Sequence, residues 1–542
     1  MTDNEIVFFF VITNKTKIIK MRVYVLNVVI LVLLTTTLRS CSQTEKEFSK
    51  LEQIILTSTG EVVKLFKEKS ELIWPDFDLS LQPFIVYIPN KWALLVNYDK
   101  DIDGFSEYPD DWPDIYTDAR LRLGNFNGLN GQLQFNLKID SIETLAIGFP
   151  EGFFKVDDPN TMIEIFAFTV HESFHQFQRQ SFGEIPWARE EKYPILDPEN
   201  STLCYIEMQL LRNSLKAMNA DDEEKCRELL KDFATVRENR WEMADKFVKQ
   251  YEQGQELNEG TAKYVEVKSI LLLRESKNTR SYDNDPNLYA LLSSDKAEKY
   301  LELEFNRIME NNSISPDDMI RNRIYPTGAA EGILLDYTGI EWKKKAQKAG
   351  TDFTFSGLIK DDIFIETKTA KSGLSEILEE YNYNSIKSNT TQQIKEYTEL
   401  YESELKEFEN QSGIRIEILF NYKSLARAGN TRAKKWIMKN GSESLCMDYR
   451  LFKLETESLT CLLENIAVYQ VYDWDNKHIK VVFYTEELGS SIINNIEYPI
   501  QKVSDSEFEN ISLKGKGIEI SMKHAGRIEL TGKNIIITQN LE

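Results

Sequence analysis

The stretch FAFTVHESFHQFQRQ, residues 166–180, is the most informative part of the sequence. Its apolar residues recur at the three- and four-residue spacing of a helix with one buried side. On such a helix, His171 and His175 project from the same side about one turn apart. Two imidazoles so placed can bind one Zn²⁺, and Glu172 can then take a proton from a water that the metal activates. The alternative is a pair of histidines on the wet side of an ordinary helix.

The composition favours the metal-binding interpretation. The chain has only four histidines, and the other two, His478 and His524, lie far along the sequence. An H-E-x-x-H run therefore rarely arises by chance in such a chain. The helix is predicted to begin at Asp158-Pro159, a capping residue followed by proline at the first helical position. The predicted apolar stripe consists of Ile163, Phe166, Ala167, Val170, Phe174 and Phe177.

A catalytic zinc usually needs a third protein ligand, and a carboxylate is the best candidate here. The segment QYEQGQELNEGTAKYVEVK, residues 250–268, lies in a strong helical pattern. Glu259 is favoured because Gly260 and Ala262 are small and let two helices approach closely. Glu266 is a candidate for orienting a ligand histidine. In a regular helix, four glutamates of this segment would lie near one side: Glu252, Glu256, Glu259 and Glu266. The alternative to a metal ligand is that these glutamates form a solvated acidic stripe.

HESFH followed by NEGTAKYVE resembles the gluzincin group of zinc metallopeptidases, mainly over residues 75–350. The resemblance implies that His171, His175 and Glu259 bind Zn²⁺ and that Glu172 is the general base. It implies a peptide or protein substrate. The segment 176–258 between the two motifs is much longer than in compact thermolysin-like members.

An enzyme of this kind also needs a donor for the oxyanion of the reaction. Tyr325, in RNRIYPTGAAEG, residues 321–332, resembles the tyrosine that some gluzincins use in this role. Arg321 and Arg323 are alternatives, either for the oxyanion or for a substrate carboxylate. Tyr325 is otherwise a half-buried packing residue.

A second metal pattern occurs in DKDIDGFSEYPD, residues 99–110. Asp99, Asp101 and Asp103 precede Gly104, and Asp110 stands at the twelfth position, which is the spacing of a calcium loop. No convincing helix flanks this segment and it contains a proline. An acidic surface loop is therefore preferred to a calcium site.

The N-terminal residues predict export. MRVYVLNVVILVLLTTTLRSC, residues 21–41, has a basic start and an apolar run too short to span a membrane convincingly. Its end resembles a bacterial lipoprotein signal with Cys41 as the lipidated residue. We therefore expect a cell-envelope lipoprotein on the periplasmic or surface side, bound to the membrane by its lipid, or a secreted protein if Cys41 is not modified. Cys446 and Cys461 flank predicted strands and are candidates for a disulfide.

The 542 residues predict several domains of α+β class. Residues 1–41 are a leader, 42–411 a metallopeptidase-like domain, and 412–542 an antiparallel β domain, either a sandwich or a partial barrel. The second domain is predicted to be mostly helical after 159, with a small N-terminal sheet. Strands are expected near 82–88, 92–97 and 132–149, a loop over most of 98–130, and helices near 44–70, 199–218, 222–277, 295–310, 326–348 and 374–410.

The net charge of −22 argues against nucleic acid as the main partner, because phosphate binding needs clustered Lys and Arg. The leading hypothesis is an exported, lipid-anchored zinc peptidase. The alternatives are a non-catalytic surface-binding lipoprotein on the same scaffold and a zinc hydrolase that acts on a non-peptide amide.

Overall fold

The structure is a computed structural model. The leader with Cys41, together with Asp110 and Pro159, lies outside the residues that it describes. No helix in the described part of the chain is both long and apolar enough to cross a membrane. The structure describes residues 48–542 except 110–111, 113–117, 125–133, 153, 159, 187, 276–298, 367–372, 422–426, 432–434, 439–440, 457, 487, 499–504 and 541–542.

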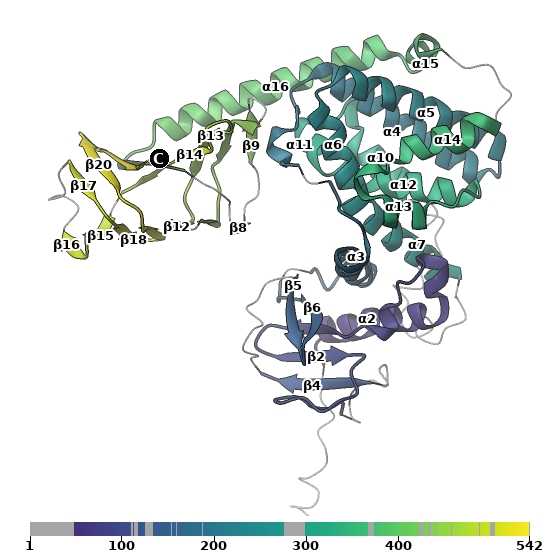
Figure 1. Ribbon diagram of the computed structural model, residues 1–542, viewed down its shortest axis with the longest axis horizontal. Helices are drawn as coiled ribbons and strands as arrows, with labels where there is room; N and C mark the ends of the chain where they lie inside the picture. The colour runs from purple at the N-terminus through teal and green to yellow at the C-terminus, as the bar shows by residue number, and fades with distance from the viewer. Residues whose placement is uncertain are drawn as a thin grey trace, which may run out of the picture.

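The predicted α+β class is confirmed, with a largely helical region followed by a β region (Figure 1). Helix α2 (Lys50–Ile73) precedes a six-stranded sheet of order β3-β4-β2-β1-β6-β5, in which only the pair β1 and β6 is parallel. Its strands β3 and β4 lie in the segment predicted to be mostly loop. In β4, Ala119 and Leu121 are buried and the residue between them is only partly buried. This alternation is too short to be recognised as a strand from the sequence. The strands are β1 (Phe84–Ile88), β2 (Trp92–Val96), β3 (Ser106–Glu107), β4 (Ala119–Leu123), β5 (Gln134–Ile139) and β6 (Ile142–Gly148).

Helix α3 (Thr161–Ser181) carries the H-E-x-x-H run and lies between the small sheet with α2 and the remaining helices (Figure 1). It begins at Thr161, later than predicted, because the Asp158 carboxylate accepts the backbone N–H of Asn160 and forms a turn there. The predicted apolar side of the helix packs inward. The ring of Phe174 lies 5.0 Å from that of Trp74 and 5.1 Å from that of Phe77.

The other helices lie on the opposite side of α3 from the small sheet (Figure 1), and α7 packs directly against α3. The helix predicted over 222–277 is broken after Met243, because the Asp245 side chain accepts the backbone N–H of Phe247 and caps a new helix. The helix predicted over 326–348 also ends early, at Tyr337, and Gly339 follows with a φ of +73°. Helices α11 and α14 were not predicted. The helices are α4 (Pro198–Asn219), α5 (Glu223–Met243), α6 (Lys246–Gln255), the π-helical turn η3 (Glu256–Gly260), α7 (Thr261–Glu275), α10 (Tyr300–Ile308), α11 (Pro316–Ile320), α12 (Ile324–Tyr337), α13 (Lys343–Ala349), α14 (Phe355–Glu366), α15 (Leu374–Glu380) and α16 (Tyr383–Glu409).

Two sheets form a C-terminal sandwich that begins with β7 (Ile414–Asn421), and apolar residues of both sheets share one core. Strand pairing is antiparallel except between β7 and β21 (Asn534–Gln539). Cys446 and Cys461 are buried free thiols, so the candidate disulfide between them is not formed in the structure. The other strands are β8 (Arg427–Thr431), β9 (Trp436–Met438), β10 (Glu443–Cys446), β11 (Leu451–Glu455), β12 (Leu459–Glu464), β13 (Val468–Asp473), β14 (His478–Thr485), β15 (Leu488–Ile493), β16 (Ile496–Tyr498), β17 (Ser506–Phe508), β18 (Ile511–Gly515), β19 (Ile518–Met522) and β20 (Gly526–Thr531).

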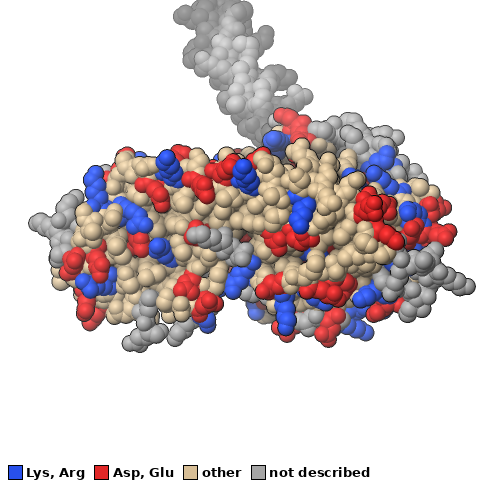
Figure 2. All heavy atoms as spheres, turned by 90° about the horizontal axis from the view of Figure 1, so that it is seen from above, with Lys and Arg blue, Asp and Glu red and all other residues tan. Residues whose placement is uncertain are grey.

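The long helix α16 joins the helical region to the sandwich (Figure 1). The ring of its Tyr397 lies 4.7 Å from that of Trp436 in β9, so the two regions share an apolar contact. On the face shown in Figure 2, acidic and basic side chains are interspersed along the molecule.

Gly260 and Gly328 allow the π turn and helix α12 to cross closely next to Glu259. A Cβ on Gly328 of α12 would lie 2.7 Å from the Cα of Gly260, which ends the π turn. This distance is shorter than any normal contact, and the obstructing atom belongs to the backbone. The crossing therefore depends on the absence of both side chains.

Replacing Gly328 by alanine should force α12 and the π turn apart. We expect G328A to lower the free energy of unfolding by about 1–3 kcal/mol, as overpacking does elsewhere. Urea unfolding followed by circular dichroism measures this change. G373A is the control, because a Cβ there meets no atom closer than 3.7 Å. Equal stability of the two variants would contradict the close crossing.

Candidate metal centre

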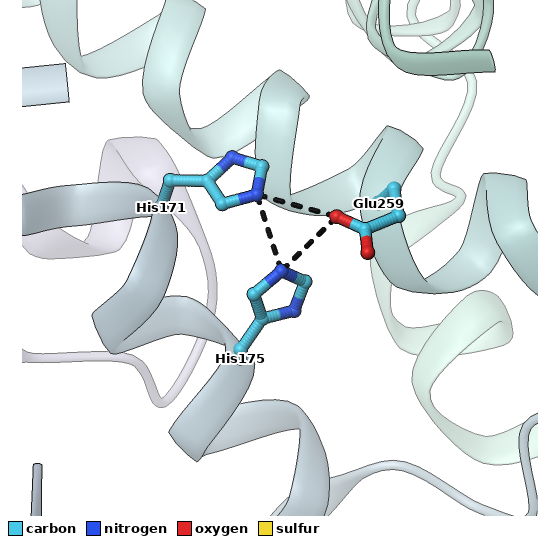
Figure 3. Close-up of side chains that lie close together, drawn as sticks. All are labelled: His171, His175 and Glu259. Atoms are coloured by element: carbon cyan, nitrogen blue, oxygen red, sulfur yellow. Dashed lines mark hydrogen bonds and ion pairs between the residues drawn. The ribbon is translucent and has the colours of Figure 1, made fainter. Parts of the chain in front are cut away.

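Three side chains from two helices converge in the helical region (Figure 3). The Nε2 atoms of His171 and His175 lie 3.1 Å apart, and Glu259 Oε2 lies 3.4 Å from the first and 3.2 Å from the second. His171 is buried, and the side chains of His175 and Glu259 are only 11% and 12% exposed. Among the residues that the structure describes, this is the one group of three or more His, Cys, Asp or Glu whose ligand atoms come within metal-binding range of one another.

The separations of these atoms fit a shared zinc ion. Zinc binds imidazole nitrogen and carboxylate oxygen at about 2.0–2.2 Å, so two ligands of a tetrahedral site lie about 3.3 Å apart. All three measured separations fall close to that value. Two nitrogens and one carboxylate oxygen are also a donor set that zinc prefers.

The electrostatics of the cluster favour a cation. Burial alone would raise the pKa of Glu259, but the two adjacent imidazoles hold it well below its ordinary value. Burial alone would lower the pKa of His171, but hydrogen bonds with Glu259 and Glu266 raise it to about 9. The carboxylates therefore keep positive charge at this point, which a metal ion can supply in place of protons.

The glutamates of the 250–268 segment do not share one side of the helix, contrary to the prediction. Glu252, ahead of the π turn, and Glu256, its first residue, point into a buried cluster of arginines. Glu259 and Glu266 point toward His171. A π turn holds one more residue than an α turn, so it rotates the following residues relative to the preceding ones. Periodicity alone could not reveal this change of register.

Glu266 lies where it can orient His171. Its Oε2 is 3.4 Å from His171 Nδ1, on the opposite side of the ring from Glu259. Its Oε1 accepts a 2.7 Å hydrogen bond from the Lys263 ammonium, which also lies 3.1 Å from Glu304. Burial alone would raise the pKa of Glu266, but Lys263 and His171 lower it to about 2. Glu266 is therefore a carboxylate at neutral pH.

A cavity of about 440 Å³ opens beside this cluster, between α3, α7, α10 and the start of α12. His171, Glu172 and Tyr325 all line it. The ring of Tyr325 stacks beside that of His171, with centroids 5.9 Å apart. Burial and then the Glu259 carboxylate raise the pKa of Tyr325, so its hydroxyl stays protonated and can donate a hydrogen bond.

The two arginines considered as alternatives to Tyr325 differ in position. Arg323 is 1% exposed and donates to the buried carboxylate of Glu252, so it cannot contact a substrate. Arg323 is therefore excluded as an alternative to Tyr325. Arg321 is largely exposed and forms a 2.7 Å ion pair with Glu190.

A buried charged cluster lies behind the π turn, and it was not predicted from the sequence. Arg237 bridges Glu207 of α4 and Glu256 of the π turn, with 2.7 Å hydrogen bonds to both. Arg240 and Arg323 both donate to Glu252. The described members are three arginines and four glutamates, the fourth glutamate being Glu331 of α12, so the charges balance if one carboxyl keeps a proton. Burial raises the pKa of Glu331 well above its ordinary value, and no described group donates a hydrogen bond to its oxygens.

Gln178 is another residue that the sequence analysis did not identify. Its side-chain oxygen lies 2.7 Å from His175 Nδ1, and the residue is 2% exposed. The available signal was its position three residues after His175, on the same side of one helix.

The acidic loop at 99–110 does not gather carboxylates. The side chains of Asp99, Asp101 and Asp103 belong to no group of ligand atoms at metal-binding distance within the described residues. Arg120 instead donates to the backbone carbonyls of Asp99 and Lys100 and lies 3.6 Å from the Asp101 carboxylate. A guanidinium at this position opposes calcium binding.

Comparison with known protein families, curated proteins and solved structures finds no match to this chain.

The geometry predicts one zinc ion per chain. Removing one ligand should weaken zinc binding by more than the roughly 10–100-fold that loss of a hydrogen bond to a ligand costs. We expect H175A to lose zinc during dialysis against a weak chelator, as measured by elemental analysis. H478A, a substitution in the sandwich, should keep the metal. Zinc retained by H175A would exclude His175 as a ligand.

The charged cluster predicts a large loss of stability when Glu252 is replaced and a small change when Glu331 is replaced. Glu252 accepts hydrogen bonds from Arg240, Arg323 and Trp241, so E252Q leaves buried positive charge without a partner. We expect it to lower the free energy of unfolding by about 3–5 kcal/mol. E331Q replaces a neutral acid by a neutral amide and should change this free energy by less than about 1 kcal/mol. Urea unfolding of both variants tests the assignment, and a large loss in E331Q would refute it.

Proposed function

We propose that the protein is a zinc-dependent peptidase of the gluzincin kind, exported and held at the cell envelope by a lipid on Cys41. The observation that carries the proposal is the convergence of His171, His175 and Glu259 at zinc-ligand separations. Glu172 and Tyr325 line one cavity at the edge of the same cluster, where a substrate carbonyl can enter. Export rests on the leader pattern alone.

A zinc ion held by the three ligands would supply Lewis acidity, polarising the substrate carbonyl and making a water easier to deprotonate. Glu172 accepts the proton of the attacking water as the new C–O bond forms. Its carboxylic acid then returns the proton to the amide nitrogen as the C–N bond breaks. The products are a carboxylic acid and an amine, and Glu172 ends as the carboxylate with which it began.

Tyr325 donates its hydroxyl hydrogen bond to the carbonyl oxygen as negative charge develops there. Its raised pKa suits this role, because the phenol does not ionise at neutral pH. Glu266 accepts the Nδ1–H of His171 and keeps that ring turned with Nε2 toward Glu259. The cavity of about 440 Å³ has room for a few substrate side chains and remains open to solvent for a longer chain.

The proposal predicts that E172Q abolishes turnover without releasing the metal. The amide that replaces the carboxylate cannot take up a proton, so we expect kcat to fall by about 10²–10⁴-fold while the zinc content stays at the wild-type value. A quenched-fluorescent peptide library and elemental analysis measure the two quantities. E71Q is the control, because Glu71 is an exposed residue at the end of α2.

Activity in E172Q with zinc bound would remove Glu172 as the base. Zinc binding by the wild type without turnover of any peptide would favour the non-catalytic binding role. Turnover of small amides but not of peptides would assign a different substrate class.

A further inference from the structure

Gln178 lies on α3, the helix of His171 and His175, and its side chain reaches the π turn that carries Glu259. Its side-chain nitrogen lies 3.0 Å from the carbonyl oxygen of Leu257, 2.8 Å from that of Asn258 and 2.8 Å from Thr261 Oγ1. The first two acceptors belong to the π turn that carries Glu259. On its other side, the Gln178 oxygen faces His175 Nδ1 at 2.7 Å.

These contacts determine the orientation of the amide. Carbonyl oxygens only accept hydrogen bonds, so the atom facing Leu257 and Asn258 must be the NH₂ group. The atom facing His175 is therefore the amide oxygen, which only accepts. His175 Nδ1 must then carry the hydrogen, and the lone pair is left on Nε2, which faces His171 and Glu259.

The same side chain holds the backbone of the π turn. The wider turn changes the regular pattern of carbonyl hydrogen bonds, and the Gln178 NH₂ group donates to two of those carbonyls. Because Asn258 adjoins Glu259, a shift of this backbone also shifts the carboxylate. One buried amide thus fixes the proton position of one ligand and the place of another.

We infer that Gln178 is a positioning residue that sets the tautomer of His175 and clamps the π turn of Glu259 for zinc binding. The inference rests on the zinc site of the proposed function, but not on peptidase activity. The inference adds Gln178 to His171, Glu172 and His175 as a fourth residue of α3 that serves the zinc site.

The test compares two buried glutamines of α3. Methionine matches glutamine in length and volume but cannot replace its hydrogen bonds, so we use Q178M. The control is Q176M, because Gln176 is also buried and donates a 2.7 Å hydrogen bond to a carbonyl, that of Glu143 in the sheet. We expect zinc affinity, measured by competition with a chromophoric chelator, to fall about 10–100-fold in Q178M and less than threefold in Q176M.

Two further measurements separate positioning from general damage. The visible absorption spectrum of the cobalt-substituted protein reports ligand geometry, and we expect it to change in Q178M but not in Q176M. Thermal unfolding of the metal-free proteins should show similar losses for both variants. T261V serves as a second variant if Q178M does not fold, because it keeps Gln178 and removes one acceptor of its amide, together with the hydrogen bond that Thr261 donates to the Leu257 carbonyl. It should weaken zinc binding at least threefold.

Zinc affinity and a cobalt spectrum in Q178M equal to those of Q176M would overturn the inference, as would wild-type affinity in T261V when Q178M cannot be purified. A wild-type protein that binds no zinc overturns both this inference and the proposed function. A wild-type protein that binds zinc without turnover refutes the peptidase alone, and the affinities of the variants still decide the role of Gln178.

Discussion

The packing of α3 against α7, whose preceding π turn carries Glu259, is the contact on which the candidate site depends. His171 and His175 come from one helix and Glu259 from another, so their ligand atoms meet only if the two helices keep a fixed distance and rotation. The aromatic core around Trp74 holds the apolar side of α3, and the close crossing of Gly260 and Gly328 holds the π turn from its other side. Local helix propensity alone does not produce the site.

The charged cluster behind the π turn adds a second constraint. Buried ions are costly unless their partners and hydrogen bonds are in place, so each arginine requires its glutamates at particular positions. Arg237 ties Glu256 of the π turn to Glu207 of α4 in this way. A displacement of the π turn would therefore break buried ion pairs as well as separate Glu259 from the two histidines. The geometry of the candidate site and the buried charged cluster are therefore linked through one short segment.

The sequence was sufficient for the features that follow from regular periodicity. The helix of His171 and His175, its apolar side and the change from helices to short alternating strands could all be predicted. Glu259 was identified from its small neighbours and the N-E-G resemblance, and the structure places it beside both histidines.

The remaining features depend on contacts between distant residues. The position of Glu252 away from the site follows from the π turn, whose extra residue has no compositional signature. Arg323 could be kept as an alternative to Tyr325, because its burial becomes evident only when Glu252 is in place. Gln178 is an ordinary helical residue until the carbonyls of Leu257 and Asn258 lie beside it. Strand β4 is defined by pairing with β2 rather than by its own short pattern.

The direction in which Glu259 points depends on the number of residues in the π turn, not on which residues they are. Each residue of an α-helix turns the chain by about 100°, so deleting one residue ahead of Glu259 would convert the π turn into an α turn and swing that carboxylate away from the histidines. All three residues would remain in the sequence and the H-E-x-x-H run would be intact. The convergence of the two histidines and the glutamate can thus be lost through a change of length alone, and a search for those three residues in a sequence would not detect the loss.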